Sequence, residues 1–174
     1  MESLFDLWKE KVPYYGESFK PMFELIALKG SLGGNRVGLG KHFDTNYELY
    51  MYAFFLGLSK KEFVPIPEGS KRITFNHHIK YWGNKNSSAR KDFSLLQKYM
   101  FAAIIAKTDL DFIKIEKGEI GEEDAVKKLM NTFESYTNGG LTLIQEQMNE
   151  NANRFLQSTA FMNMLIPISD NKIS

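Results

Sequence analysis

One segment, residues 45–58, constrains the fold of this chain more than any other part of the sequence. Its letters, TNYELYMYAFFLGL, place apolar side chains on one helical stripe and on most of the remaining circumference. A helix that is apolar nearly all round is buried between other elements, and its aromatic side chains belong to a core far more often than to a ligand cage. We therefore predict a buried central helix here, with Asp44 as its N-cap.

The rest of the chain shows the same helical period, because apolar residues recur at spacings of three and four and few segments alternate as a half-buried strand would. Ser3 and Asp6 suit the start of the first helix, and Pro21 suits the first turn of the second. The apolar segment 93–107 is predicted to share the centre of the fold with 45–58. Further helices are predicted at residues 3–12, 18–29, from 122 onward and 141–166. Gly139 and Gly140 are predicted to break or reorient the chain between the last two, and Pro167 to end the last one.

These patterns predict an all-α fold, a single-domain bundle of about six or seven helices over residues 1–174 with one long irregular basic connection. The length suits one substantial core, and no internal repeat or linker divides it. In the connection, residues 59–88, Pro65 and Pro67 disfavour a continuous helix. Residues 73–81 are compatible with a short strand or a helical turn, and periodicity does not decide between them.

The basic character of this connection is concentrated in residues 71–91, KRITFNHHIKYWGNKNSSARK. The segment holds six basic residues, two histidines and three aromatics without one carboxylate, although the whole chain carries a net charge of only +1. Residues 1–91 carry 14 Lys and Arg against 9 Asp and Glu, whereas residues 92–174 carry 8 against 12. An acid-free segment favours a local surface that attracts anions, although such charges are as often a solvated face.

A glycine-rich segment, residues 29–43, supplies a second group of basic residues but fits no nucleotide-binding signature. A P-loop requires a glycine where Asn35 stands and a hydroxyl where His42 stands, and the dinucleotide fingerprint fails at Phe43. This loop would hold a phosphate through its backbone amides and the ends of its basic side chains, or it would simply connect two helices. From both segments we predict phosphate contacts by Arg36, Lys41, Lys71, Arg72, Lys80, Lys85, Arg90 and Lys91.

The aromatic residues of the basic segment have two possible roles. Tyr81, Trp82 or Phe75 would stack on an unpaired base, or they would fill the core. The size and apolar character of Trp82 favour the core for that residue.

Catalytic and metal-binding residues are sparse in this sequence. The chain has no cysteine, and His42, His77 and His78 belong to no recognisable triad or chelating motif. Adjacent His77 and His78 would point in different directions on a helix or a strand. We therefore predict no cofactor and no metal, and an unrecognised hydrolase that gathers these histidines with carboxylates remains a third hypothesis.

The chain also resembles a known family in the order of its motifs: Arg36 to Leu39 as R-x-G-L, then NYELYMYAFFLGL, the loop with IPEGS, ITFNHHIKYWG and later YTNGGL. This order, over residues 36–92 and 131–160, is similar to the small helical DndE-type proteins of bacterial DNA phosphorothioation systems. The additional N-terminal helices and the acidic segment from Asp109 depart from the compact family pattern.

The resemblance implies an all-helical protein that associates with DNA, alone or as an oligomer, within a DNA-modification or defence gene set. By position it implies phosphate contacts by Arg36, Lys41, Lys71 and Arg72, and it implies no sulfur chemistry by this chain. We therefore expect a noncatalytic DNA-associated accessory protein.

The alternative is a protein-interaction or scaffold module whose acidic and basic halves meet other subunits or copies of itself. The chain start lacks the pattern of an export signal, and no run is long enough to cross a bilayer, so we expect a cytoplasmic protein with no membrane partner.

Overall fold

The computed structural model describes residues 3–27, 42–83 and 91–166. These residues form seven α-helices and one small two-stranded sheet, which confirms the predicted all-α fold. The helices are α1 (Leu4–Lys9), α2 (Lys20–Ile26), α3 (Asn46–Lys60), α4 (Ser94–Lys107), α5 (Phe112–Glu116), α6 (Glu122–Asn151) and α7 (Ala160–Leu165). The strands are β1 (Tyr15–Gly16) and β2 (Arg72–Ile73), and short 3-10 helices occur at η1 (Glu17–Phe19), η3 (Ile79–Tyr81) and η4 (Ala152–Leu156).

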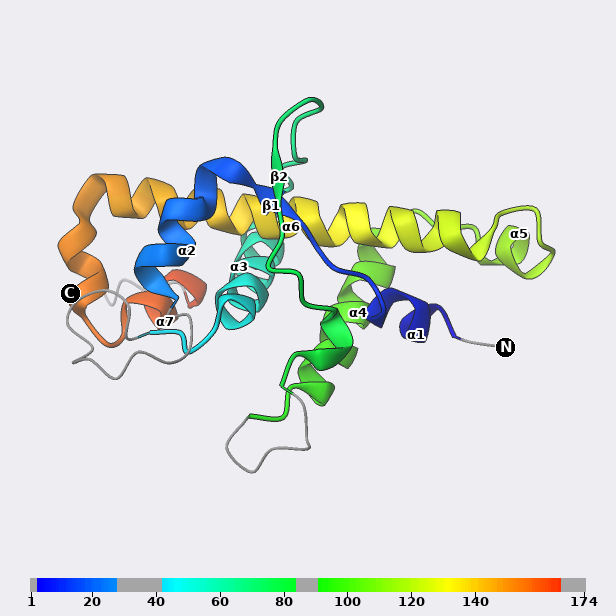
Figure 1. Cartoon of the computed structure of the whole chain (residues 1–174), viewed down its shortest axis with the longest axis horizontal. Coiled ribbons are helices and arrows are strands. Elements are labelled where there is room, and N and C mark those ends of the chain that lie inside the picture. Colours follow the sequence, from blue (N-terminus) through cyan, green and yellow to red (C-terminus); the bar gives the residue numbers. More distant parts are fainter. Residues whose placement is uncertain (1–2, 28–41, 84–90, 167–174) are drawn as a thin grey trace, which may run out of the picture.

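The longest helix, α6, runs along the long axis of the molecule (Figure 1) and passes through Gly139 and Gly140 without a break. The prediction of a break at these glycines is therefore wrong. Both glycines lie against α3 and the residues just after it: a β-carbon on Gly140 would overlap the carbonyl oxygen of Ala53, and one on Gly139 would overlap that of Glu62. The absence of side chains lets the two segments pack backbone to backbone, which offsets the low helix propensity of glycine.

The core is built on the contact between α3 and α6. Tyr50 and Phe54 of α3 pack their rings against Phe133 of α6, with centroids 5.3 and 5.0 Å apart, and Trp8 of α1 packs against Phe133 at 5.5 Å. Segment 93–107 does form the predicted helix, α4, and it shares the centre of the fold only in part, through Met100 and Ile104 in the core. Its buried side chains are Gln97, Met100 and Ile104, and the opposite face of the helix is exposed in the described structure.

The helix starts agree in part with the sequence signals. The Ser3 hydroxyl accepts a hydrogen bond from the Asp6 amide at 3.2 Å, and Pro21 lies in the first turn of α2, both as predicted. Asp44 is not the N-cap of α3. Thr45 takes that position, because its extended backbone lets the hydroxyl accept from the Glu48 amide at 3.3 Å. The first helix also ends at Lys9, before the predicted end.

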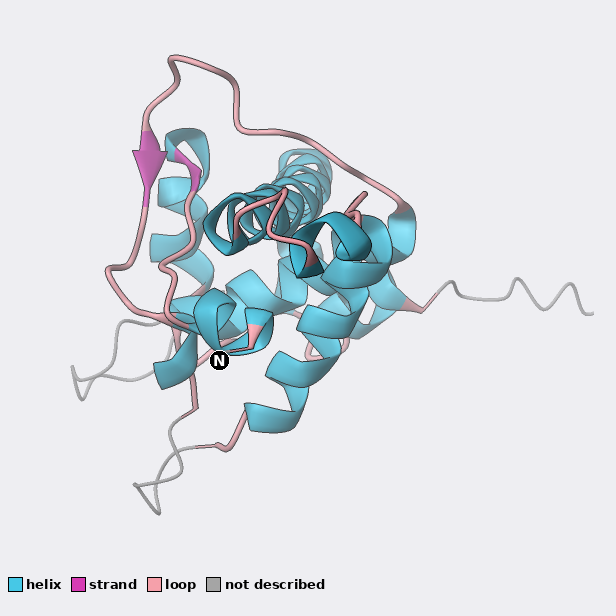
Figure 2. Ribbon diagram, turned by 90° about the vertical axis from the view of Figure 1, so that its right-hand side faces the viewer, coloured by secondary structure: helices cyan, strands magenta, loops and turns pink. Residues whose placement is uncertain are grey.

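The long connection is tied to the helices by short elements. Its strand β2 pairs antiparallel with β1, and Figure 2 shows the two strands at one side of the group of helices. Farther on, Gln97 of α4 donates to the carbonyls of Ile79 and Trp82 at 3.0 and 2.9 Å. Trp82 is 1% exposed, so its predicted core role is confirmed.

None of the helices in the described ranges combines the length and the apolar character needed to span a bilayer.

Candidate interaction surfaces

The structure describes four of the eight basic residues predicted to contact phosphate, and each of the four forms an ion pair. Arg36, Lys41, Lys85 and Arg90 lie outside the described residues. The pairs are Lys71 with Glu17 at 2.6 Å, Arg72 with Glu134 at 3.5 Å, Lys80 with Glu10 at 2.6 Å, and Lys91 with Asp44 and Glu48 at 3.5 Å each.

These pairs give the acid-free segment a structural role. The carboxylates that the segment lacks come from the N-terminal region, from α3 and its preceding loop, and from α6, so each pair joins the connection to another part of the fold. Glu48 and Asp44 raise the pKa of Lys91, and Glu10 raises that of Lys80, which keeps both amines charged. A phosphate group would have to compete with these carboxylates, although exposed pairs are individually weak.

The three histidines lie in two separate environments. The imidazole of His42 contacts the Phe155 carbonyl and the ring of Phe161, near α7. His77 stacks on Tyr47 of α3, and His78 contacts the Glu10 carbonyl after α1. Within the residues that the structure describes, no group of three or more His, Cys, Asp or Glu side chains is placed to hold a metal ion.

Glu134 is the most unusual charged residue of the described structure. It is buried on α6, where one carboxylate oxygen accepts the Tyr14 amide at 3.0 Å and the other lies 3.5 Å from Arg72. Burial raises the pKa of Glu134 to about 7, and the Tyr14 amide and Arg72 oppose this shift only in part. The sequence reasoning missed Glu134, although its spacing of four from Met130 and eight from Val126 places it on the buried stripe.

Glu134 lines a cavity of about 650 Å³ between the N-terminal segment, β2 and the first half of α6. The cavity also collects Lys11, His78 and Glu123. Its charges are largely paired across its own walls, because Lys11 contacts Glu123 at 3.2 Å and Arg72 contacts Glu134. The cavity therefore offers few uncompensated charges to a ligand, and its polar groups join the long connection to α6.

The outer face of α4 is the second surface that the sequence reasoning missed. Leu95 and Tyr99 are each 58% exposed, and Ala102 and Ala106 continue the same face at spacings of three and four. In Figure 1, α4 runs away from α6 toward the lower edge of the molecule. Spacings of four, three and four form the seam of a helix that packs on another helix. The apolar pattern of α4 correctly indicated contact, but the sequence reasoning assigned the whole helix to the core, where only the opposite face lies.

No protein-family model, no curated protein and no solved structure matches this chain. The resemblance to DndE-type proteins therefore stays a prediction.

Proposed function

We propose that this protein is a noncatalytic protein-interaction module that assembles with a second copy of itself through α4. The observation that carries this proposal is the exposed seam of Leu95, Tyr99, Ala102 and Ala106. Large exposed apolar side chains at helical spacing, with small residues beside them, are typical of a helix that packs against another helix.

The order of large and small residues on this face favours a second copy as the partner. When two copies of α4 pair antiparallel about a two-fold axis between residues 100 and 101, Leu95 of one copy faces Ala106 of the other, and Tyr99 faces Ala102. Each large side chain then meets a small one, which allows close packing without overlap. One patch serves both copies, as a two-fold symmetric interface requires.

The energetics predict a weak, concentration-dependent dimer. Fully burying a large apolar side chain stabilises by about 1.5–3 kcal/mol, and Leu95 and Tyr99 are already partly covered in the single copy. Two copies contribute four such side chains, against an association cost of about 4–15 kcal/mol. We therefore expect a dissociation constant on the order of micromolar or weaker.

Sedimentation equilibrium over a wide range of protein concentration tests the proposal. The average mass of the unmodified protein is expected to rise toward that of a dimer, and Tyr99→Glu is expected to remain monomeric because it places a charge in the seam. Ile113→Glu on α5, also at an exposed apolar position, is the matched control and is expected to associate normally. A mass that stays monomeric at the highest concentration contradicts the proposal.

A second candidate is a noncatalytic DNA-associated accessory protein of a bacterial modification or defence system. The acid-free segment 71–91 favours it, and the candidate phosphate contacts among the residues that the structure describes are Lys71, Arg72, Lys80 and Lys91. The pairs of Lys71 and Lys80 with exposed carboxylates are worth about 0–1 kcal/mol each, so a polyanion is able to displace these carboxylates. Arg72 differs, because it pairs with the buried Glu134.

DNA association is tested with intact, nicked and single-stranded DNA at low ionic strength. Affinity is expected to fall steeply with added salt. Charge reversal at Lys71, Arg72, Arg90 and Lys91 is expected to abolish binding, whereas Lys117→Glu, just after α5, is expected to preserve it. The absence of affinity for all three DNA forms, or unchanged binding by the charge-reversed variant, rules the candidate out.

A further inference from the structure

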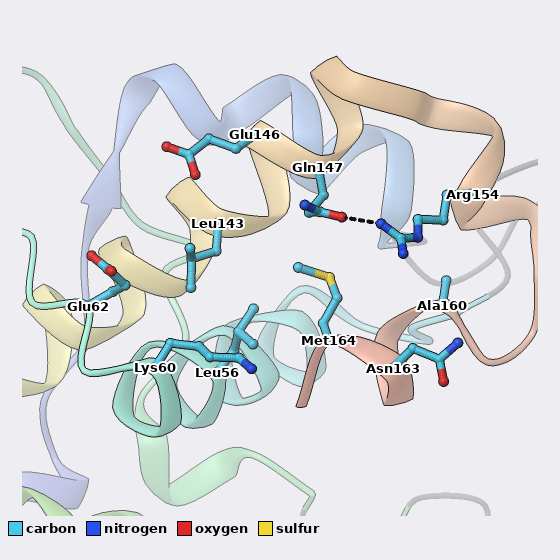
Figure 3. Close-up of a pocket in the computed structure, with 10 residues that line it drawn as sticks. All are labelled: Leu56, Lys60, Glu62, Leu143, Glu146, Gln147, Arg154, Ala160, Asn163 and Met164. Atoms are coloured by element: carbon cyan, nitrogen blue, oxygen red, sulfur yellow. Dashed lines mark hydrogen bonds between the residues drawn. The ribbon is translucent and has the colours of Figure 1, made fainter. Parts of the chain in front are cut away.

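A second cavity lies nearer the C-terminal end of α6, between α3, η4 and α7. Its volume is about 440 Å³, within the range typical of small-molecule sites. Figure 3 shows Leu56, Leu143 and Met164 gathered around its centre. Leu56 is buried, and Leu143 and Met164 are half-buried, so these side chains give the cavity an apolar floor with part of its surface open to a ligand.

The charged residues of this cavity are not paired with one another. Lys60, Glu62, Glu146 and Arg154 all line it, and none of them forms an ion pair with any other residue in the described ranges. The basic connection is different, because each of the four basic residues that the structure describes there forms an ion pair with a carboxylate. The charges around this cavity are therefore available to a ligand without the loss of an internal ion pair.

Arg154 is held in place by a neutral partner. Its guanidinium donates to the side-chain oxygen of Gln147 at 2.7 Å, and the Gln147 amide donates in turn to Glu150 at 3.3 Å. An amide oxygen orients the guanidinium but does not cancel its charge, and the remaining N–H groups are able to bind two oxygens of an anionic group. In Figure 3, Glu62 and Glu146 lie on the opposite side of the cavity from Arg154.

We propose that this cavity binds a small amphipathic anion, with an apolar body on Leu56, Leu143 and Met164 and a carboxylate or sulfonate on Arg154. Lys60 also lines the cavity and supplies a second positive charge. This site shares no lining residue with the α4 seam, so it does not depend on the proposed function.

Two dyes of nearly the same shape test the charge and the apolar parts of the proposal. Anilinonaphthalene sulfonate is an aromatic anion, and phenylnaphthylamine is its uncharged relative. The fluorescence titration is expected to show tighter binding of the sulfonate, and Arg154→Gln is expected to weaken that binding about tenfold, the effect of one lost charge-assisted hydrogen bond. Arg154→Lys is expected to weaken it as well, because an ammonium does not reproduce the two-point contact.

Two controls separate the cavity from other apolar surfaces. Leu95→Ala on α4 is expected to leave sulfonate binding unchanged. In protein with methyl-labelled methionine, the sulfonate is expected to shift the NMR signal of Met164, which lines the cavity, and not that of Met162, which is 61% exposed on the same helix. Equal affinity for both dyes, unchanged binding by Arg154→Gln, or a shift at Met162 without one at Met164 each overturns the proposal.

Discussion

Gly140 of α6 lies directly against the backbone of Ala53 in α3, so closely that a β-carbon at position 140 would overlap the Ala53 carbonyl oxygen. Gly57 makes the reciprocal contact, because a β-carbon there would overlap the carbonyl oxygen of Tyr136 on α6. Glycines on both helices therefore set the distance between the two elements that carry most of the core.

Gly140→Ala is expected to lower the free energy of unfolding by about 3 kcal/mol, because the overlap is with backbone atoms that cannot rotate away. Urea denaturation measures the change. Gly121→Ala, at the N-cap of α6 where an added β-carbon would have its nearest neighbour at 3.6 Å, is expected to cost less than about 1 kcal/mol. Equal effects of the two substitutions would mean that α3 and α6 do not pack as described.

The pH dependence of stability is expected to show the titration of Glu134. Its pKa in the folded protein is about 7, against an ordinary value of 4.5. Between these values the folded state keeps the proton and the unfolded state has released it, so stability falls as the pH rises toward 7 and then levels off. The total loss is about 3 kcal/mol.

Glu134→Gln removes this titration, because glutamine is uncharged yet still accepts the Tyr14 amide. Relative to the unmodified protein, the variant is expected to gain up to about 3 kcal/mol of stability between pH 4.5 and 7, measured by urea denaturation at several pH values. Glu123→Gln, whose side chain is 81% exposed, is the control and is expected to show no such gain. If the difference in the free energy of unfolding between Glu134→Gln and the unmodified protein does not vary with pH, the raised pKa of Glu134 is disproved.

The attachment of the long connection to α4 depends on Gln97. Gln97→Leu keeps the size of this buried side chain but removes the donor to the Trp82 and Ile79 carbonyls. The Ile79 carbonyl still accepts the Trp82 amide at 3.0 Å, so the carbonyl left without a donor is that of Trp82. The free energy of unfolding is therefore expected to fall by about 1–3 kcal/mol. Thermal or urea unfolding checks this, with the exposed neighbour Lys98→Leu as the control for a change of polarity. If Gln97→Leu destabilises the protein no more than Lys98→Leu does, Gln97 does not attach the long connection to α4.

The sequence was sufficient to predict the helical class and several local features. The capping role of Ser3, the place of Pro21 and the burial of Trp82 all depend on near neighbours or on side-chain chemistry, which a single sequence displays. Gly139 and Gly140 were misjudged because helix propensity is a local quantity, whereas their actual role is a contact with residues some 80 positions earlier in the chain.

The candidate surfaces were harder to predict because they depend on the spatial partners of charged and apolar side chains. The cations of the acid-free segment were visible, but their carboxylates come from distant positions such as Glu17 and Glu134. The apolar pattern of α4 likewise indicated a helix that packs against other elements. It did not show that Leu95 and Tyr99 face away from the core.

The proposed pairing of α4 with a second copy fixes which residues of the two helices face each other, and disulfide cross-linking between engineered cysteines tests this register. The chain has no cysteine of its own, so single substitutions introduce the only thiols. When Leu95→Cys and Ala106→Cys chains are mixed under mild oxidation, a cross-linked mixed dimer is expected, because these positions face each other across the two-fold axis. A mixture of Leu95→Cys and Ala102→Cys chains places the thiols about one helical turn apart and is expected to cross-link much less, since a disulfide requires Cα atoms within about 7 Å. Mass spectrometry of the products measures the two yields. Equal yields from the two mixtures would contradict the antiparallel register, even if the protein were dimeric.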